Sequence, residues 1–104
     1  MSPASRFGMT DPILRRRIAQ VVGDSSRVLF TRHARMRMRR RKVVPTQVLH
    51  ALRLGYVVEP AHRNIRGNWQ CTLEAHVAGE QVRVVAALLE ESEGEWAVII
   101  TVMN

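Results

Sequence analysis

The spacing of the apolar residues changes at Gly55, and this change limits the folds that are open to the chain. Before Gly55, apolar residues such as Leu14, Ile18 and Val21 recur every three or four positions, a spacing typical of amphipathic helices. After Gly55 they alternate with polar residues or form short continuous runs, which predicts strands. We therefore expect an α+β domain with N-terminal helices packed on a three- to four-stranded antiparallel β-sheet.

Capping residues delimit the expected helices. Asp11 and Thr31 are the expected N-caps of helices over residues 12–22 and 32–42, and Pro45 begins a third helix that ends at Gly55. Residues 28–30 are expected to be extended or simply to lead into the second helix. Residues 1–9 have no period and predict a flexible N-terminal arm, ahead of a single domain over residues 10–104.

The second half of the chain predicts strands joined by polar turns. Tyr56 begins an expected entry strand that ends before Pro60, and residues 60–68 are expected to form a loop. Three strands follow, which we place at residues 69–75, 81–89 and 96–103. The last two are almost continuously apolar, so we expect both of their faces to be largely covered.

The composition excludes several classes of protein. A chain of 104 residues with 46% hydrophobic residues predicts one small folded domain rather than a disordered chain. Cys71 is the single cysteine and cannot form an internal disulfide, and with four scattered histidines it predicts no metal site and no cofactor. No apolar run is long enough to span a bilayer, so we expect a cytoplasmic protein without a membrane partner.

The charges are distributed unevenly along the chain. Fifteen of the sixteen cationic residues lie in residues 1–66 beside three acids, a net charge of +12, whereas residues 67–104 carry −5. This asymmetry favours a basic face for a polyanion, with nucleic acid as the leading partner. The alternatives are a solvated arginine-rich helix face or a patch that docks an acidic protein. Arginine outnumbers lysine fifteen to one, which favours bidentate contacts with phosphate or carboxylate.

Several segments carry a resemblance to a known family. They begin with Phe-Thr-Arg-His-Ala-Arg-Met-Arg-Met at residues 30–38 and continue through residues 48–55, 66–73, 82–86 and 98–102. Over about residues 27–103 the chain resembles a small bacterial family called domain of unknown function 4258. The family's His-Ala-x-x-Arg-Met core fits His33-Ala34 together with Arg37-Met38. Residues 40–43 are Arg-Arg-Lys-Val, where the family usually has an acidic residue or glycine.

This family is similar in its order of helices and sheet to the RelE-like and BrnT-like toxins of bacterial toxin–antitoxin pairs. Those toxins are small, basic, metal-independent ribonucleases. The resemblance therefore implies a RelE-like fold, RNA as the substrate and an acidic antitoxin protein as a partner. A likeness of fold and size does not by itself determine an activity, so these implications are expectations.

RNA cleavage without a metal ion requires a base for the 2′-hydroxyl proton and cations around the phosphate. His33 and Arg37 lie one helical turn apart and are the candidate catalytic pair, with His33 as the general base and Arg37 holding the phosphate. The candidate RNA-binding residues are cations on the same helix and in later segments: Arg32, Arg35, Arg40, Arg41, Lys42, Arg63, Arg66 and Arg83. In the structural alternative, His33 only caps or packs its helix.

Three functions remain open at this point. The first is a toxin-like, metal-independent endoribonuclease. The second is a non-catalytic nucleic-acid-binding module in which residues 32–42 follow the phosphates. The third is an interaction protein that docks an acidic partner, either an antitoxin or, as a homodimer, a second copy of the chain. Sequence-specific DNA reading is disfavoured, because the arginines lie on the first helix of the helical pair and not on the second.

Overall fold

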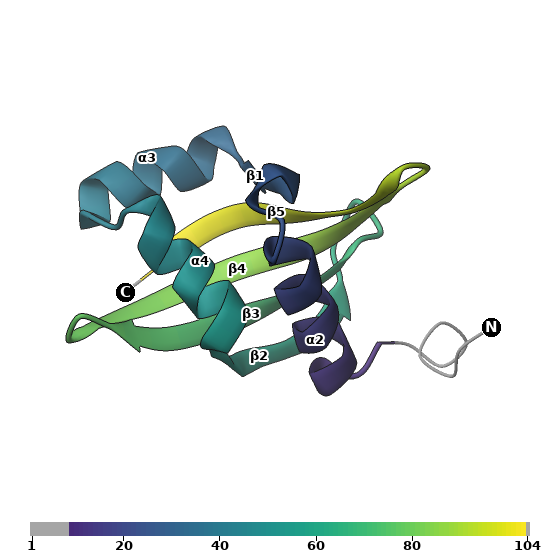
Figure 1. Cartoon of the computed structure of the whole chain (residues 1–104), viewed down its shortest axis with the longest axis horizontal. Coiled ribbons are helices and arrows are strands. Elements are labelled where there is room, and N and C mark those ends of the chain that lie inside the picture. Colours follow the sequence, from purple (N-terminus) through teal and green to yellow (C-terminus); the bar gives the residue numbers. More distant parts are fainter. Residues whose placement is uncertain (1–8, 104) are drawn as a thin grey trace.

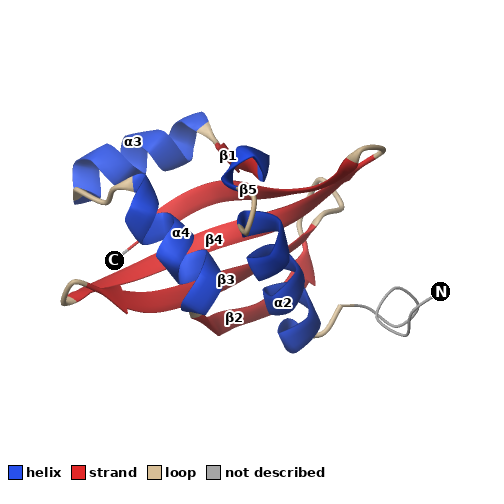
Figure 2. Ribbon diagram, viewed as in Figure 1, coloured by secondary structure: helices blue, strands red, loops and turns tan. Residues whose placement is uncertain are grey.

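The structure is a computed structural model that describes residues 9–103. A five-stranded sheet in the order β1-β5-β4-β3-β2 carries helices on one face, as Figures 1 and 2 show. The helices are α2 (Asp11–Val22), η1 (Ser25–Arg27), α3 (Arg32–Arg41) and α4 (Pro45–Leu54). The strands are β1 (Val28–Phe30), β2 (Tyr56–Arg63), β3 (Trp69–Val77), β4 (Glu80–Glu91) and β5 (Gly94–Met103).

The α+β class is confirmed, but the expected three to four antiparallel strands are a wrong description of the sheet. The sheet is mixed, because β1 pairs in parallel with β5 and aligns Val28 with Ala97 and Phe30 with Ile99. The other three pairings are antiparallel. A strand of three residues is too short to show a period, and its partner lies at the other end of the chain. Residues 28–30 therefore gave no sequence signal for a sheet strand.

Strand β2 is longer than expected and passes through Pro60. Proline is tolerated there because β2 is an edge strand whose register with β3 shifts on both sides of Glu59. The backbone N–H of Ala61 donates to the Asp11 carboxylate at 2.7 Å. Asp11 is therefore not the N-cap of α2; Thr10 is, and its hydroxyl accepts from the N–H of Ile13. The side chain of Asp11 instead satisfies a donor on the sheet edge.

The turn between α3 and α4 sets the angle between these two helices. Thr31 is confirmed as the N-cap of α3, and the helix ends at Arg41 because Lys42 adopts a left-handed conformation with φ 57°. Pro45 begins α4 as predicted. The side chain of Gln47 accepts from the backbone N–H of Val44 at 2.9 Å. In Figure 1 the two helices diverge from this turn.

The hydrophobic core lies between the helices and one face of the sheet. Buried side chains of α2 and α4, such as Leu14, Ile18 and Leu52, pack against alternate residues of the central strands. The sheet contributes Cys71, Leu73, Ala75, Val82, Val84, Ala86, Leu88, Ala97, Ile99 and Val102. Met9, expected in the arm, is 9% exposed and belongs to this core, whereas residues 1–8 of the arm lie outside the described residues. Among residues 9–103, no helix has the length and apolar character needed to cross a membrane.

Among residues 9–103, no helix lies on the opposite face of the sheet, so the expected cover on both faces of the last two strands is only partly present. Val85 and Ala87 of β4 are buried on this face by their neighbours. Val98 and Ile100 of β5 remain partly exposed. This open face is where the candidate site lies.

Gly55 separates the helical half from the strands, and its place in the packing requires the absence of a side chain. A Cβ atom at Gly55 would overlap the carbonyl oxygen of Ala51 and lie 2.8 Å from that of Glu74. We expect Gly55→Ala to lower the free energy of unfolding by about 2–3 kcal/mol, because both obstacles are backbone atoms of packed elements. Urea denaturation of the two proteins measures this difference.

Gly23→Ala is the matched control, because Gly23 also ends a helix but has a helical φ and a single neighbouring atom at 3.1 Å. We expect the control to change stability by less than about 1 kcal/mol. Equal effects of the two substitutions would contradict the close packing of α4 on β3.

Candidate functional site

A cleft of about 500 Å³ lies on the open face of the sheet. Its floor is apolar and comes from three adjacent strands: Leu29 of β1, Ala87 and Leu89 of β4, and Val98 and Ile100 of β5. Its rim is polar and comes from two segments that are distant in the sequence: Thr31 and His33 at the start of α3, and Asn64, Arg66 and Asn68 in the β2–β3 loop. An apolar floor with a few convergent polar groups is the usual character of a binding site.

The start of α3 is attached to β5, and this attachment places His33 at the cleft. The N–H of Thr31 donates to the carbonyl of Ile99 at 3.1 Å, and its hydroxyl donates to that of Ile100 at 3.0 Å. The same hydroxyl accepts from the N–H of Ala34 at 3.0 Å. His33 lies between these two anchored positions, and its side chain is exposed. The backbone of His33 is therefore fixed beside the cleft, and its side chain remains accessible.

Asn64 organises the loop that carries Arg66. Its side-chain oxygen accepts from the N–H groups of Arg66 and Asn68, both at 3.0 Å, and its amide donates to Gln70 at 3.0 Å. The backbone closes the turn from Gly67 to Asn64 at 2.9 Å, with Gly67 at φ 82°. These contacts order the loop, so Arg66 is presented at the rim. Sequence reasoning identified Arg66 but missed Asn64, although Asn followed by Gly within a few residues is a turn signal.

Arg37 does not line the cleft with His33. Its Nε donates to the carbonyl of Val102 at 3.5 Å, beyond the end of β1, and its side chain is half-buried. Arg37 thus covers part of the β5 edge that β1 leaves unpaired. His33 and Arg66 both line the cleft, whereas Arg37, one helical turn from His33, is not among the lining residues. The catalytic role of His33 and Arg37 stays a prediction.

The remaining predicted cations fall into two groups. Arg63 and Arg83 are engaged: Arg63 stacks on Trp69 at 4.9 Å from the ring centre and donates to the carbonyl of Gly67, and Arg83 pairs with Glu74. The cations of α3 and its C-cap are exposed: Arg32, Arg35, Arg40, Arg41 and Lys42. Of these, Arg35 lines a groove between α3 and α4.

A buried carboxylate network closes one end of the open face. Glu74 is 5% exposed and accepts hydrogen bonds from Tyr56, Gln81 and Arg83. The hydrogen bond from Tyr56, followed by that from Arg83, lowers the pKa of Glu74 from its ordinary value of 4.5 to about 2. The same hydrogen bond raises the pKa of Tyr56. Glu74 alternates with the core residues of β3 and so lies on the face away from the helices, where these partners bury it.

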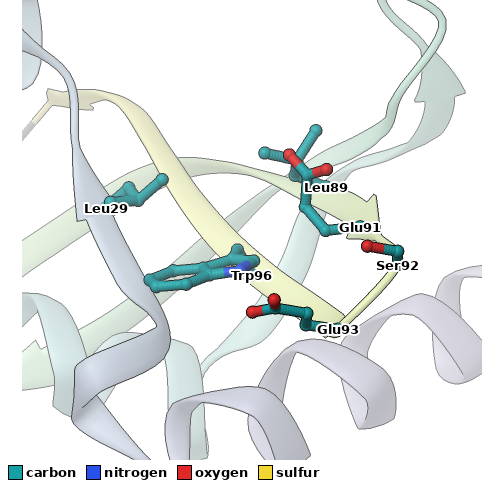
Figure 3. A pocket seen from close by; sticks show the side chains of 6 residues that line it. All are labelled: Leu29, Leu89, Glu91, Ser92, Glu93 and Trp96. Atoms are coloured by element: carbon teal, nitrogen blue, oxygen red, sulfur yellow. The ribbon is translucent and has the colours of Figure 1, made fainter.

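The acidic β4–β5 hairpin bounds the other end of the open face. A second cavity of about 410 Å³ lies at this end. Figure 3 shows the ring of Trp96 among the other lining side chains, Leu29, Leu89, Glu91, Ser92 and Glu93. It shares Leu29 and Leu89 with the cleft, so the two are contiguous. On the hairpin, Arg17 pairs with Glu95, and Arg27 donates to the carbonyl of Glu93 at 3.1 Å and stacks on Trp96. The exposed Glu91 and Glu93 make this end unfavourable for phosphate.

The fold and the site together define a small α+β protein with helices on one sheet face and, on the other, a cleft whose polar rim includes Arg66. Residues 30–104 match the family described as Domain of unknown function (DUF4258), and the chain belongs to this family. No curated protein and no solved structure matches the chain.

The Glu74 network predicts a pH-dependent stability. Because folding lowers the pKa of Glu74, the stabilisation is complete above the ordinary value of 4.5 and is lost as the pH falls from 4.5 through about 2. We expect Glu74→Gln to be less stable than wild type at neutral pH, with the difference shrinking across this acidic range. Urea unfolding at a series of pH values measures the difference.

Glu80→Gln is the matched control, since Glu80 is an exposed glutamate on the neighbouring strand. It should follow the wild-type profile. A Glu74→Gln deficit that is the same at every pH would contradict a charged, hydrogen-bonded Glu74.

Proposed function

We propose that the protein binds single-stranded RNA in the cleft on its open sheet face and cleaves it as a metal-independent endoribonuclease. The observation that carries this proposal is that His33 and Arg66, from separate segments, line one cleft with an apolar floor. The activity is toxin-like and RelE-like, and we assign it to the bacterial cytoplasm as part of a toxin–antitoxin system. An unstacked base lies on the apolar floor, and the phosphate faces the basic rim.

The chemistry follows from the two side chains. His33 accepts the proton of the ribose 2′-hydroxyl, and the 2′-oxygen attacks the adjacent phosphorus. The bond from phosphorus to the 5′-oxygen breaks, and this oxygen takes a proton from solvent. The products are a 2′,3′-cyclic phosphate and a 5′-hydroxyl. Arg66 stabilises the negative charge that gathers on the phosphoryl oxygens, because its guanidinium can donate two parallel hydrogen bonds.

A second candidate function is binding without cleavage. In the part of the chain that the structure describes, no hydrogen bond orients the imidazole of His33, whereas a general base is usually positioned by a further group. In this case the exposed cations of α3 and Arg66 hold RNA through phosphate contacts alone. Affinity would then fall steeply with salt while the RNA stays intact.

The test uses purified wild type, His33→Ala and Arg66→Ala with a short unstructured RNA and with chelator present. We expect His33→Ala to lower the cleavage rate by about 100-fold or more while leaving RNA affinity within about twofold, as for loss of a general base. We expect Arg66→Ala to weaken RNA affinity by about fivefold to tenfold and to slow cleavage, as for loss of a charged hydrogen bond. Gel analysis with mapping of cyclic-phosphate ends measures both quantities.

His50→Ala and Arg16→Ala are the controls, since both side chains are exposed on helices that cover the other sheet face. Both variants should behave as wild type. Intact RNA that still binds wild type would replace the enzyme with the binding module. Absence of RNA binding would overturn both functions.

A further inference from the structure

A third cavity lies away from the cleft and from the cavity at Trp96, in the angle between α3 and α4. This groove has a volume of about 380 Å³, and its apolar surface comes from Phe30, Met38, Val43, Val44 and Pro45. Met38 and Val43 belong to the core, so they form a firm base. Val44 is 52% exposed, so apolar surface continues outward to solvent.

Two arginines form one wall of the groove. Arg35 and Arg39 lie one helical turn apart on α3 and both line it. Successive residues of a helix are rotated by about 100°, so Arg35 lies about 200° around α3 from His33. Arg39 shares the side of Arg35, and Arg37 shares the side of His33. The two flanks of α3 therefore face different surfaces.

The groove and its surroundings carry positive charge without local compensation. Residues 31–58 contain no Asp or Glu. Within the described range 9–103, the ion pairs of arginine are those of Arg17 and Arg83, and neither residue is on α3. A ligand that fits this groove therefore supplies carboxylates or other anions.

The local structure does not explain the exposed valine at the start of α4. Val44 is the N-cap, a position where Ser, Thr, Asp or Asn normally satisfies a free N–H, and its side chain makes no capping hydrogen bond. Half of the side chain is exposed to water. Its apolar surface continues that of the groove, as expected where a partner covers it.

We propose that the α3–α4 groove docks an acidic amphipathic helix of a partner protein. One or two aliphatic side chains of that helix pack on Phe30, Val43 and Val44. Glutamates or aspartates one turn apart pair with Arg35 and Arg39, whose spacing along α3 they match. This proposal is independent of the RNA cleft, which lies on the other flank of α3.

The chemistry of the groove favours a protein over a nucleic acid. Phosphate contacts need donors but no apolar base, and bases stack on exposed aromatic faces, whereas this groove is lined mainly by aliphatic side chains. A helix laid into an apolar groove uses side chains spaced at i and i+4 as anchors. Paired arginines beside such a surface recognise carboxylates in fixed geometry.

The test uses a fluorescein-labelled helical peptide with leucines at i and i+4 flanked by glutamates. A second peptide of the same composition has shuffled positions, so that no face is apolar. Fluorescence anisotropy with the full chain measures both affinities. We expect the patterned peptide to bind about tenfold or more tightly than the shuffled one, because only it combines aliphatic anchors with correctly spaced carboxylates.

Matched variants locate the binding. We expect Val44→Ser and Arg39→Gln each to weaken binding of the patterned peptide by about fivefold, as for loss of an apolar anchor and of a charged hydrogen bond. Leu54→Ser removes an even more exposed apolar side chain at the other end of α4, and Arg40→Gln removes a cation from the outer face of α3. Both controls should bind the patterned peptide within about twofold of wild type, since neither residue lines the groove.

Three outcomes would overturn the proposal. The first is that the two peptides bind with equal affinity, or that the patterned peptide shows no saturable binding with a dissociation constant below about 1 mM. This dissociation constant corresponds to a binding free energy of about 4 kcal/mol. The second is an equal effect of Arg39→Gln and Arg40→Gln, which indicates diffuse charge attraction. The third is loss of binding of an unstructured RNA in Val44→Ser, which would assign the groove to nucleic acid instead. Failure of RNA binding or cleavage at the cleft leaves the two peptide outcomes unchanged, so they test the groove by themselves.

Discussion

The hydrogen bonds of Thr31 to β5 are the contacts on which the arrangement of the molecule depends. This residue ends the short strand β1, bonds to the carbonyls of Ile99 and Ile100, and caps α3 through its hydroxyl. Three residues of parallel pairing would hold β1 weakly by themselves. Together with the cap, they join the N-terminal half of the chain to its last strand. The direction of α3, the angle of the groove and the place of His33 all follow from this junction.

Helices on a single face leave the sheet with two free edges and one open face, and polar side chains protect all three. Asp11 and Arg15 satisfy backbone groups at the β2 end, by accepting from Ala61 and donating to Gly55. Arg37 bonds to the β5 edge. On the open face, the Glu74 network and the acidic hairpin close the two ends and leave an apolar middle. Sheet edges that are blocked in this way disfavour pairing with another strand.

Several arginines bond to the protein's own backbone or carboxylates, and this changes what the uneven charge distribution along the sequence implies. Arg15, Arg17, Arg27 and Arg37 bond to the fold itself, and the acidic hairpin of the C-terminal half is the partner of Arg17 and Arg27. The net charge of residues 1–66 therefore overstates the number of cations that are available to bind a polyanion. Among the described residues, the exposed cations that lie near the cleft or the groove include Arg66 and, on α3, Arg35 and Arg39.

Local patterns in the sequence determined the helices, the cap of α3 at Thr31, the start of α4 at Pro45, and the alternating strands after Gly55. Each of these features depends on residues within a few positions of one another. Other features depend on partners that are far apart in the chain. They are the parallel β1–β5 pair, the path of β2 through Pro60, the burial of Glu74, and the placement of His33 and Arg66 around one cleft. Only the tertiary structure decided them. The spacing of apolar residues predicts which face of a helix or strand a side chain occupies, but it does not predict which backbone group or charged side chain will contact it. His33 and Arg66 were both recognisable as candidates, yet their common cleft exists only because α3 and the β2–β3 loop reach the same face of the sheet.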